Sequence, residues 1–268
     1  MLTDITLGKY FPGESPLHQM DARVKIVLLF FYIIAVFLFD NNINYALMTG
    51  FAISLIIMSR LPVGMVLKSI KPLWWIILFS FLMHIFSTPG ESLVKVWILD
   101  ITGEGILKGF IISLRLILLI LVSSLLMFTT SPLKLTDALE SLMSPLKHIG
   151  FPAHELAMMM TIAMRFIPTL LEETDKIIKA QQSRGSNIGD GNFLERAKGM
   201  LPVLVPLFIS AFRRADELSV AMEARCYRGG EERTRMKQQR VHQIDYIAAG
   251  VFIVFIAILV AVQVLWTA

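Results

Sequence analysis

Cysteine and charged residues are both scarce in this chain of 268 residues. The one cysteine, Cys226, excludes an internal disulfide and any metal site built from cysteines alone. Charged residues make up only 17% of the chain, against roughly 25% in soluble domains. Hydrophobic residues make up 55%, and the mean hydropathy is +0.66. These values exclude a disordered chain, a coiled-coil rod and most soluble enzymes, and they indicate an integral membrane protein.

Two catalytic motifs are also missing. The sequence G-x-x-x-x-G-K-[ST] does not occur, so the chain cannot itself supply an ATP site of that type. His154-Glu155 begins like the zinc-binding pattern H-E-x-x-H, but Met158 stands where the second histidine is required. Apolar segments also contain Ser123, Ser124 and His84, without a visible acid–base partner. An intramembrane hydrolase is therefore only a minor alternative.

Long stretches without Asp, Glu, Lys or Arg dominate the rest of the chain. They cover residues 26–39, 41–59, 72–90, 116–133 and 246–268. A helix that crosses a bilayer needs about 20 mainly apolar residues, within a range of about 17–25. Lys25 borders the shortest stretch, and its side chain can extend to the lipid headgroups. We therefore predict five transmembrane helices, near residues 24–39, 43–59, 72–88, 106–130 and 245–266.

The positive charges alternate between the loops that join these spans. Residues 131–243 carry 16 of the 25 Lys and Arg residues, whereas the loop after the first span and the tail after the last carry none. Cytoplasmic loops are enriched in Lys and Arg, which places the N-terminus and residues 131–243 in the cytoplasm and the C-terminus outside. The predicted domains are residues 1–130 (tail and transmembrane helices 1–4), 131–243 (cytoplasmic coupling-helix domain) and 244–268 (last transmembrane helix).

The cytoplasmic segment has a helical pattern of apolar residues. Three amphipathic helices are predicted, near residues 133–147, 153–183 and 193–224. Ser131-Pro132 is a typical start for the first of them. The charge-free run 199–212 is short and contains two prolines, so we assign it to the middle of the third helix and not to another span. The predicted fold class is an all-α integral membrane protein with about five transmembrane helices and three amphipathic helices on the cytoplasmic side.

The two long amphipathic helices end in the same way, with a small residue followed by arginine. The two ends read Ser183-Arg184-Gly185 and Ala224-Arg225-Cys226. An arginine at a helix C-terminus interacts favourably with the helix dipole, by roughly 0.3–1 kcal/mol. That interaction alone would explain a single arginine at the end of one helix. A planar guanidinium on a rigid helix end is also suited to bidentate docking onto carboxylates. The repetition favours docking, onto two partner subunits or one dimer.

This combination resembles the T component of energy-coupling factor (ECF) vitamin transporters, and the resemblance covers nearly the whole chain. The matching segments are Tyr10-Phe-Pro-Gly13, Ser15-Pro-Leu-His18, Asp21-Ala-Arg23, Thr129-Thr-Ser-Pro132, Asp137-Ala-Leu-Glu140 and Arg165-Phe-Ile-Pro168. The most specific match is the pair of Ala-Arg-Gly signatures that end the family's two coupling helices. Ser183 replaces alanine in the first signature and Cys226 replaces glycine in the second, while both arginines are kept.

The resemblance implies a non-catalytic transport subunit in the plasma membrane of a prokaryote. Its coupling helices would dock into two ATP-binding-cassette ATPases, with Arg184 and Arg225 as anchors. Those ATPases bind the ATP, so no cofactor and no nucleic acid is expected on this chain. Its apolar surface would hold a small membrane protein, the S component, which binds the vitamin and is reoriented by the ATP-driven motion. The alternative, a conventional permease subunit, usually offers each ATPase one short coupling helix.

Side chains expected to face the S component lie on both long helices. They are Met158, Met159, Met160, Met164, Leu204 and Phe208. Flexible methionines suit a surface that accepts several partners, and they equally suit gap-filling in a buried face. The sequence leaves both interpretations open.

Three further features are explained by structural roles and do not require a functional one. Arg115 lies within the fourth span, where we expect a structural partner such as His84 or a backbone carbonyl more than a role in coupling. Pro168, Pro202 and Pro206 either bend the two long helices or mark where those helices cross. The acidic and basic residues of positions 172–179 are expected to form a solvated helix face with local pairs four residues apart.

Overall fold

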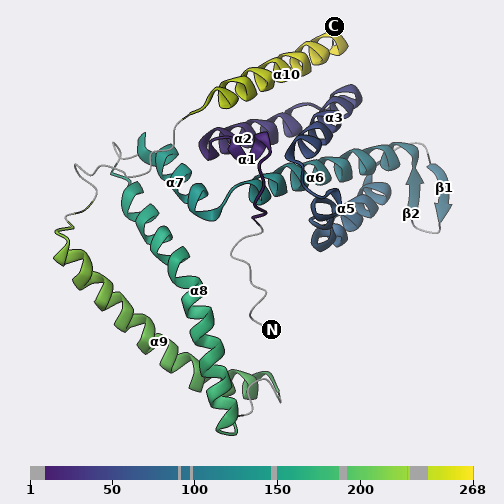
Figure 1. The fold of residues 1–268 in the computed structure, drawn as a ribbon. Coiled ribbons are helices and arrows are strands. Elements are labelled where there is room, and N and C mark those ends of the chain that lie inside the picture. Colours follow the sequence, from purple (N-terminus) through teal and green to yellow (C-terminus); the bar gives the residue numbers. More distant parts are fainter. Residues whose placement is uncertain are drawn as a thin grey trace. The chain divides into compact units, whose positions relative to one another are not determined.

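The computed structural model describes residues 10–89, 92–96, 99–145, 150–186, 192–227, 229 and 241–267 (Figure 1). The described residues fall into two compact units. One is formed within residues 136–237, and the other by the residues before and after it. One boundary between the units lies at 135/136, and the other falls among residues 230–240, outside the described range.

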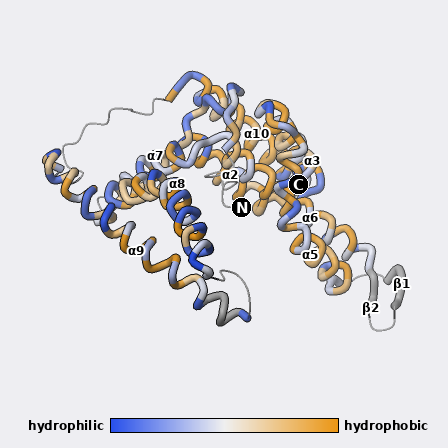
Figure 2. The backbone as a smooth tube through the Cα atoms, turned by 60° about the horizontal axis from the view of Figure 1, so that its bottom comes forward, coloured by the Kyte–Doolittle hydropathy of each residue, from blue (hydrophilic) through white to orange (hydrophobic). Residues whose placement is uncertain are grey.

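The larger unit contains the apolar helices. Its helical elements are α1 (Pro16–Gln19), α2 (Ala22–Leu38), α3 (Asn42–Ser59), α4 (Val63–Lys68), the short 3-10 helix η1 (Lys71–Leu73), α5 (Trp74–Ser87), α6 (Gly103–Thr129) and α10 (Gln243–Thr267). Four segments are long and apolar enough to cross a membrane: Asn42–Ser59, Val63–Ser87, Gly103–Thr129 and Gln243–Trp266. They coincide with four of the five predicted spans. The remaining one corresponds to α2, an apolar helix of 17 residues. Figure 2 shows that hydrophobic residues dominate all of these helices.

A short β-hairpin joins α5 to α6, and the sequence analysis did not predict it. Strands β1 (Ser92–Val96) and β2 (Leu99–Thr102) pair antiparallel, with an irregularity between Ser92 and Val94. The sequence LDIT and the second half of SLVKV do alternate apolar and polar residues, the pattern of a strand. The all-α membrane class holds, with this hairpin as an addition.

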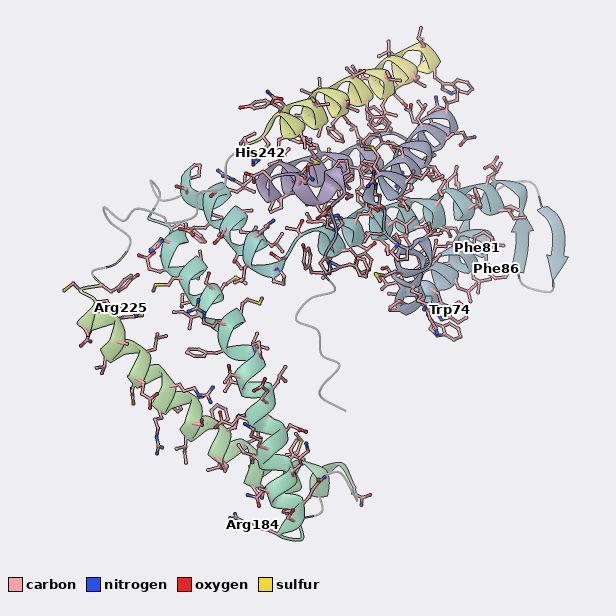
Figure 3. All side chains as sticks on the ribbon, viewed as in Figure 1. Trp74, Phe81, Phe86, Arg184, Arg225 and His242 are labelled. Atoms are coloured by element: carbon pink, nitrogen blue, oxygen red, sulfur yellow. The ribbon has the colours of Figure 1, made fainter. Side chains whose placement is uncertain are left out.

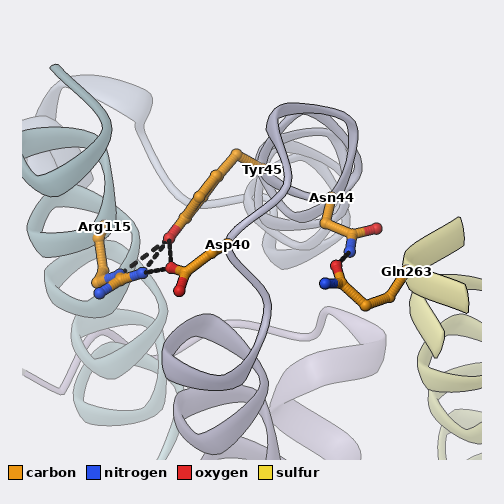
Figure 4. Close-up of polar contacts among 5 residues, drawn as sticks. All are labelled: Asp40, Asn44, Tyr45, Arg115 and Gln263. Atoms are coloured by element: carbon orange, nitrogen blue, oxygen red, sulfur yellow. Dashed lines mark hydrogen bonds and ion pairs between the residues drawn. The ribbon is translucent and has the colours of Figure 1, made fainter. Parts of the chain in front are cut away.

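The core of this unit lies where α2, α3, α6 and α10 meet. Its buried side chains are Tyr32, Ala35, Val36, Phe39, Met48, Ala52, Leu118, Val122, Phe252 and Leu259. Small residues such as Ala35 and Ala52 allow close approach of the helices, as is usual between membrane helices. Two polar contacts cross the same core: the Tyr32 hydroxyl donates to the Met48 carbonyl at 3.2 Å, and Asn44 donates to Gln263 at 3.0 Å (Figure 4).

The carboxylate of Asp245 ties the start of α10 to the start of α2. One of its oxygens accepts the backbone N–H of Asp21 at 2.8 Å, and the other accepts the N–H of His242 at 2.7 Å. Asp21 and His242 immediately precede their helices, so the carboxylate satisfies N–H groups at two helix N-termini and faces the positive ends of both helix dipoles. This interaction places the last helix of the chain beside the first long one.

Arg115 has structural partners within its unit, as expected, but in the described residues they are Asp40 and Tyr45 and not His84 or a backbone carbonyl. Its guanidinium forms an ion pair with Asp40 and hydrogen bonds with the Tyr45 hydroxyl (Figure 4). The rings of Phe37 and Tyr45 lie 5.6 Å from the guanidinium carbon, within the range of a cation–π interaction. His84 instead contacts the carbonyl of Ser80, in its own helix, at 2.7 Å. The arginine side chain reaches the turn between α2 and α3 and joins both to α6.

We expect Tyr45→Phe to destabilise the protein more than Asp40→Ala. Tyr45 is buried, and its hydroxyl accepts the Arg115 Nε–H at 3.0 Å, so its loss should cost about 1–2 kcal/mol. The Asp40 side chain is 79% exposed, and exposed ion pairs contribute about 0–1 kcal/mol. Thermal unfolding of the detergent-purified variants measures both effects. A larger loss of stability in Asp40→Ala than in Tyr45→Phe would show that the ion pair with Asp40 is the main stabilising contact of Arg115.

The smaller unit contains the two long amphipathic helices. Helix α8 spans Ala153–Ser183 and α9 spans Phe193–Ala224, the limits predicted from the sequence. Helix α7 (Pro132–Met143) bridges the boundary between the units and ends before the predicted 147, with residues 146–149 outside the described range. The Ser131 hydroxyl accepts the N–H of Lys134 at 3.5 Å, which confirms the predicted start. The run 199–212 lies within α9, as predicted.

Candidate functional site

Helix α8 ends in a regular hydrogen-bonded cap that presents Arg184. The N–H of Gly185 donates to the carbonyl of Gln182, and the N–H of Ser186 donates to the carbonyl of Gln181, both at 3.0 Å. Gly185 has a φ of +83°. This pair of bonds around a left-handed residue is the Schellman motif, which satisfies carbonyls that the helix end leaves without donors. Arg184 therefore stands at a fixed place on the last turn of α8.

Helix α9 ends in the same motif although its left-handed residue is not glycine. The N–H of Cys226 donates to the carbonyl of Glu223 at 2.8 Å, and the N–H of Tyr227 donates to the carbonyl of Met222 at 3.0 Å. Cys226 has a φ of +56°. The replacement of glycine by Cys226 thus leaves the backbone geometry of the signature intact, and Arg225 occupies the position in α9 that Arg184 occupies in α8.

Cys226→Gly is expected to stabilise the end of α9. A residue with a Cβ in the left-handed region costs roughly 1–2 kcal/mol, part of which is offset by the greater freedom of glycine in the unfolded chain. The net gain should be about 1 kcal/mol locally. Hydrogen exchange at the amides of residues 222–227 measures it, with Ser219→Gly inside α9 as a control that should increase exchange. Faster exchange in Cys226→Gly would contradict the strain assigned to Cys226.

Both arginines are exposed and lie at opposite ends of the helix pair, as Figure 3 shows. Ser183, Gly185, Ala224 and Cys226 are exposed as well. Among the described residues, neither guanidinium takes part in an ion pair within the chain. The Arg184 end of α8 contacts α9 at Pro202, and the 23 residues from Pro202 to Arg225 correspond to about 35 Å at 1.5 Å per residue. The arrangement therefore presents two similar cationic points that are separated by roughly the diameter of a small protein domain.

A polar contact braces α8 against α9 between these two points. Glu173 accepts a hydrogen bond from the Ser210 hydroxyl and one from Arg214 at 2.7 Å. Glu173 and Arg214 are both about three-quarters buried. Hydrogen bonds to charged groups are the stronger kind and demand defined geometry. Glu173 therefore limits how far the two helices can slide or rotate against each other.

The proline-containing part of α9 lies where this helix crosses α8, which is one of the two roles that the sequence left open for these residues. Pro206 has no N–H, so the carbonyl of Pro202, four residues earlier, lacks its usual helical donor. The side-chain amide of Gln181 donates to that carbonyl at 3.2 Å. Gln181 also belongs to the cap of α8. The end that carries Arg184 is thus held directly on the proline-containing part of α9.

The predicted S-component residues differ in exposure. Met159, Met160, Leu204 and Phe208 are exposed, whereas Met158 and Met164 are half-buried. The face of α9 around Leu204 and Phe208 is broader than predicted. Its exposed apolar side chains are Met200, Leu201, Leu204, Val205, Phe208, Ile209 and Phe212. On a helix these positions cover one side, while Ser210 and Arg214 on the opposite side contact Glu173 of α8.

The acidic and basic face of α8 is only partly the solvated surface that was predicted. Asp175 and Lys179 form the expected local pair at 2.6 Å, and the hydrogen bond from Lys179 lowers the pKa of the Asp175 carboxyl. Glu173 does not belong to that surface, because it faces α9. The sequence contained no signal for this, since Glu173 and Arg214 lie 41 positions apart.

Metal-binding geometry is not found in the described part of the chain, where no group of three or more His, Cys, Asp or Glu side chains could hold an ion. His154 instead contacts Glu140 at 3.0 Å and links α8 to α7. Taken together, the described geometry consists of two rigidly capped cationic helix ends, a braced crossing and an exposed apolar face. It is suited to binding proteins.

Comparison with known proteins gives a consistent result. The model of the CbiQ family, described as cobalt transport protein, matches residues 13–236. The chain is 55% identical over 259 residues to the energy-coupling factor transporter transmembrane protein EcfT of Acidaminococcus fermentans, covering 97% of each sequence. It is 53% identical over 255 residues to EcfT of Ruminiclostridium cellulolyticum, covering 95% of this chain and 96% of the relative. Identity to EcfT of Bacillus subtilis is 46% over 239 residues, with 89% and 90% covered.

Proposed function

Because this chain belongs to the EcfT/CbiQ family of transmembrane transport components, we propose that it is the coupling scaffold of an ECF-type importer. In this role it transmits ATP-driven motion from two cytoplasmic ATPases to a membrane S component. Members of this family are membrane components of transporters and are not enzymes, so the intramembrane hydrolase is excluded. The substrate bound by the S component is a vitamin or another micronutrient.

The observation that carries the proposal is the repeated cap on α8 and α9. Two helix ends with the same backbone geometry present exposed arginines, Arg184 and Arg225, at opposite ends of one braced pair. Each guanidinium can bind a carboxylate through two parallel hydrogen bonds. One chain can therefore engage two similar ATPase subunits, which supply the ATP sites that this sequence lacks. A conventional permease subunit, with one short coupling helix for each ATPase, would not need two such ends.

The exposed apolar face of α9 supports contact with the S component. Phe208 and Phe212 are 60% and 70% exposed, and large exposed apolar patches mark protein or membrane contacts. Met159 and Met160 of α8 add flexible side chains suited to exchangeable partners. By the distribution of Lys and Arg, α8 and α9 lie on the cytoplasmic side and α10 ends outside. The protein would thus be a multi-pass component of a prokaryotic cell membrane.

Cross-linking from Cys226 can test directly whether the two helix ends contact ATPases. Cys226 is exposed and adjoins Arg225, so a maleimide photo-crosslinker attached there in native membranes should join the chain to an ATPase. A Cys226→Gly/Ser183→Cys chain tests the α8 end in the same way. The matched control, Cys226→Gly/Ala257→Cys, carries its only cysteine on an exposed position of α10. Mass spectrometry should identify an ATP-binding-cassette protein at both helix ends and none at residue 257. Absence of an ATPase at both ends would overturn the proposal.

A further inference from the structure

The membrane helix α6 and the amphipathic helix α7 are joined by only two residues, Thr130 and Ser131. Thr130 has extended backbone angles, φ −132° and ψ 125°, so the chain leaves the direction of α6 at this residue. Among the helices that the structure describes, α7 is the one that continues across the boundary at 135/136. We refer to residues 128–132 as the α6–α7 joint. A displacement that travels along α7 toward the membrane helices has to pass this joint.

The end of α6 receives hydrogen bonds from two segments far earlier in the chain. The carbonyl of Phe128 would normally accept from residue 132, but Pro132 has no N–H. The backbone N–H of Phe11 donates to this carbonyl at 2.9 Å. The neighbouring carbonyl of Thr129 accepts from the ammonium of Lys25 at 3.1 Å. The two segments therefore supply hydrogen-bond donors to the last carbonyls of the helix.

Lys25 binds both the last residue of α6 and the first residue of the link. Lys25 is only 8% exposed, and its ammonium lies 3.0 Å from the Thr130 hydroxyl and 3.4 Å from the Thr129 hydroxyl. Together with the Thr129 carbonyl, these acceptors use all three N–H groups of the ammonium. The Thr129 hydroxyl donates in turn to the Leu125 carbonyl at 2.8 Å. The positive charge also interacts favourably with the C-terminal end of the α6 dipole.

The lead-in that carries Phe11 is held in place by His18. The His18 Nε2 donates to the Phe11 carbonyl at 2.9 Å, and its Nδ1 accepts from the Ser15 hydroxyl at 2.7 Å. Burial is the main cause that lowers the pKa of His18, which favours the neutral ring that one donor and one acceptor require. A Cβ at Gly13 would lie 2.9 Å from the His18 ring, so a larger residue would displace it. The joint is therefore held by two separate contacts, from the lead-in and from Lys25.

We propose that Lys25 is a positioning residue for energy coupling, which keeps the α6–α7 joint rigid by holding Thr129 and Thr130. The proposal rests on the coupling role proposed above. Hinges are commonly a few residues at the ends of helices, where the backbone angles can change. Without the ammonium, Thr130 would rotate and absorb a displacement of α7. With it, α6 and α7 move together, and the displacement reaches α2, α3 and α5, which pack on α6.

The first test compares Lys25→Met with the wild type in the complete complex, purified from native membranes and reconstituted into proteoliposomes. Methionine keeps the length and the apolar stem of lysine but donates no hydrogen bond. Isotope-labelled B vitamins and cobalt(II) are offered together, and uptake and ATP hydrolysis are both measured. Hydrolysis should continue, while uptake per ATP should fall about tenfold, because losing a hydrogen bond to a charged group shifts the balance between a held and a free joint by about that factor. Thr130→Val should lower this ratio less, and Thr130→Ser, which keeps the hydroxyl, should retain it.

Tyr32→Phe is the matched control for a merely structural role. It removes a buried hydrogen bond of the same unit, from the Tyr32 hydroxyl to the Met48 carbonyl, and leaves the joint intact. It should lower the unfolding temperature, as Lys25→Met does, without changing the uptake per ATP. An equal fall of that ratio in both variants would show that Lys25 acts only through stability, and would overturn the proposal.

A spin-label measurement reports on the joint itself and does not depend on transport. Phe110→Cys on α6 and Leu142→Cys on α7, both at exposed positions, are labelled in a Cys226→Gly chain, which has no other cysteine. In the purified complex, double electron–electron resonance should give a narrow distance distribution with Lys25 and a broader one with Lys25→Met. Equal widths would overturn the proposal. A broader distribution with the wild-type uptake per ATP would overturn it as well, because a rigid joint would then not be needed.

Failure of this proposal is distinguishable from failure of the proposed function. A wild-type complex that contains no ATPase would overturn the proposed function, and the coupling role of Lys25 with it. An importing complex with its ATPases, in which Lys25→Met keeps the wild-type ratio, would overturn the role of Lys25 alone.

Discussion

Reversing both charges in one chain, with Arg184→Glu and Arg225→Glu, is expected to remove both ATPases from the purified complex. Truncating one partner of a buried charged pair costs about 2–5 kcal/mol, and placing like charges together adds to that cost. A loss of that size lowers affinity by more than about thirtyfold at each end. Because the two ends act together, each single reversal should leave partial binding, and the double variant should leave none.

The measurement is the ATPase content per chain, by quantitative mass spectrometry of the tagged protein from its native membrane. A matched control is Lys176→Glu with Arg213→Glu, which reverses one exposed cation of α8 and one of α9, each at least eight residues from the arginine at the end of its helix. It changes the net charge equally and should keep the ATPases. The helix dipole penalty of a glutamate at a C-terminus, about 0.3–1 kcal/mol, is too small to unfold the chain. Normal ATPase content in the double variant would show that the arginines serve only as helix caps.

Replacing Glu173 with alanine is expected to reduce transport about tenfold while the complex still assembles. The substitution removes the acceptor of both Ser210 and Arg214 and leaves the partly buried Arg214 without this partner. Hydrogen bonds to charged groups contribute about 1.5–3 kcal/mol, and we take the lower end because both groups are partly exposed. Without the contacts of Glu173, α8 and α9 can slide against each other where they cross. A displacement of one helix end then no longer displaces the other helix.

The matched control is Glu172→Ala, which removes the same side chain from an exposed position one residue away. Substrate uptake into proteoliposomes, normalised to the ATPase content, separates coupling from assembly. Uptake by Glu173→Ala equal to that of Glu172→Ala would show that the crossing needs no polar brace. Loss of the ATPases from Glu173→Ala would assign the residue to assembly and not to coupling.

Local patterns account for the features that could be predicted. A span is recognised by its own run of apolar residues. The limits of α8 and α9 follow from the glycines and prolines that separate the helices, from the arginine signatures at their ends and from a repeat of 3.6 residues. The paired arginine signatures were visible because each is three residues long. Each of these features depends on residues within a turn or two of each other, so a single sequence contains the necessary information.

Contacts between distant segments could not be predicted in this way. Arg115 was given the wrong partner, because its true partners, Asp40 and Tyr45, come beside it only when α3 packs on α6. The pairing of Glu173 with Arg214 likewise depends on the angle at which α8 and α9 cross. The left-handed conformation of Cys226 was unexpected, since the residue type disfavours it and the hydrogen bonds of the cap impose it.

The sequence by itself determined the membrane class, the long helices and the two arginine ends, because hydrophobic runs and helix caps act over a few residues. The tertiary structure alone decided which polar groups meet and which side of α9 stays exposed. These depend on the packing of helices that lie far apart in the chain, and packing is set by the shapes of many side chains together.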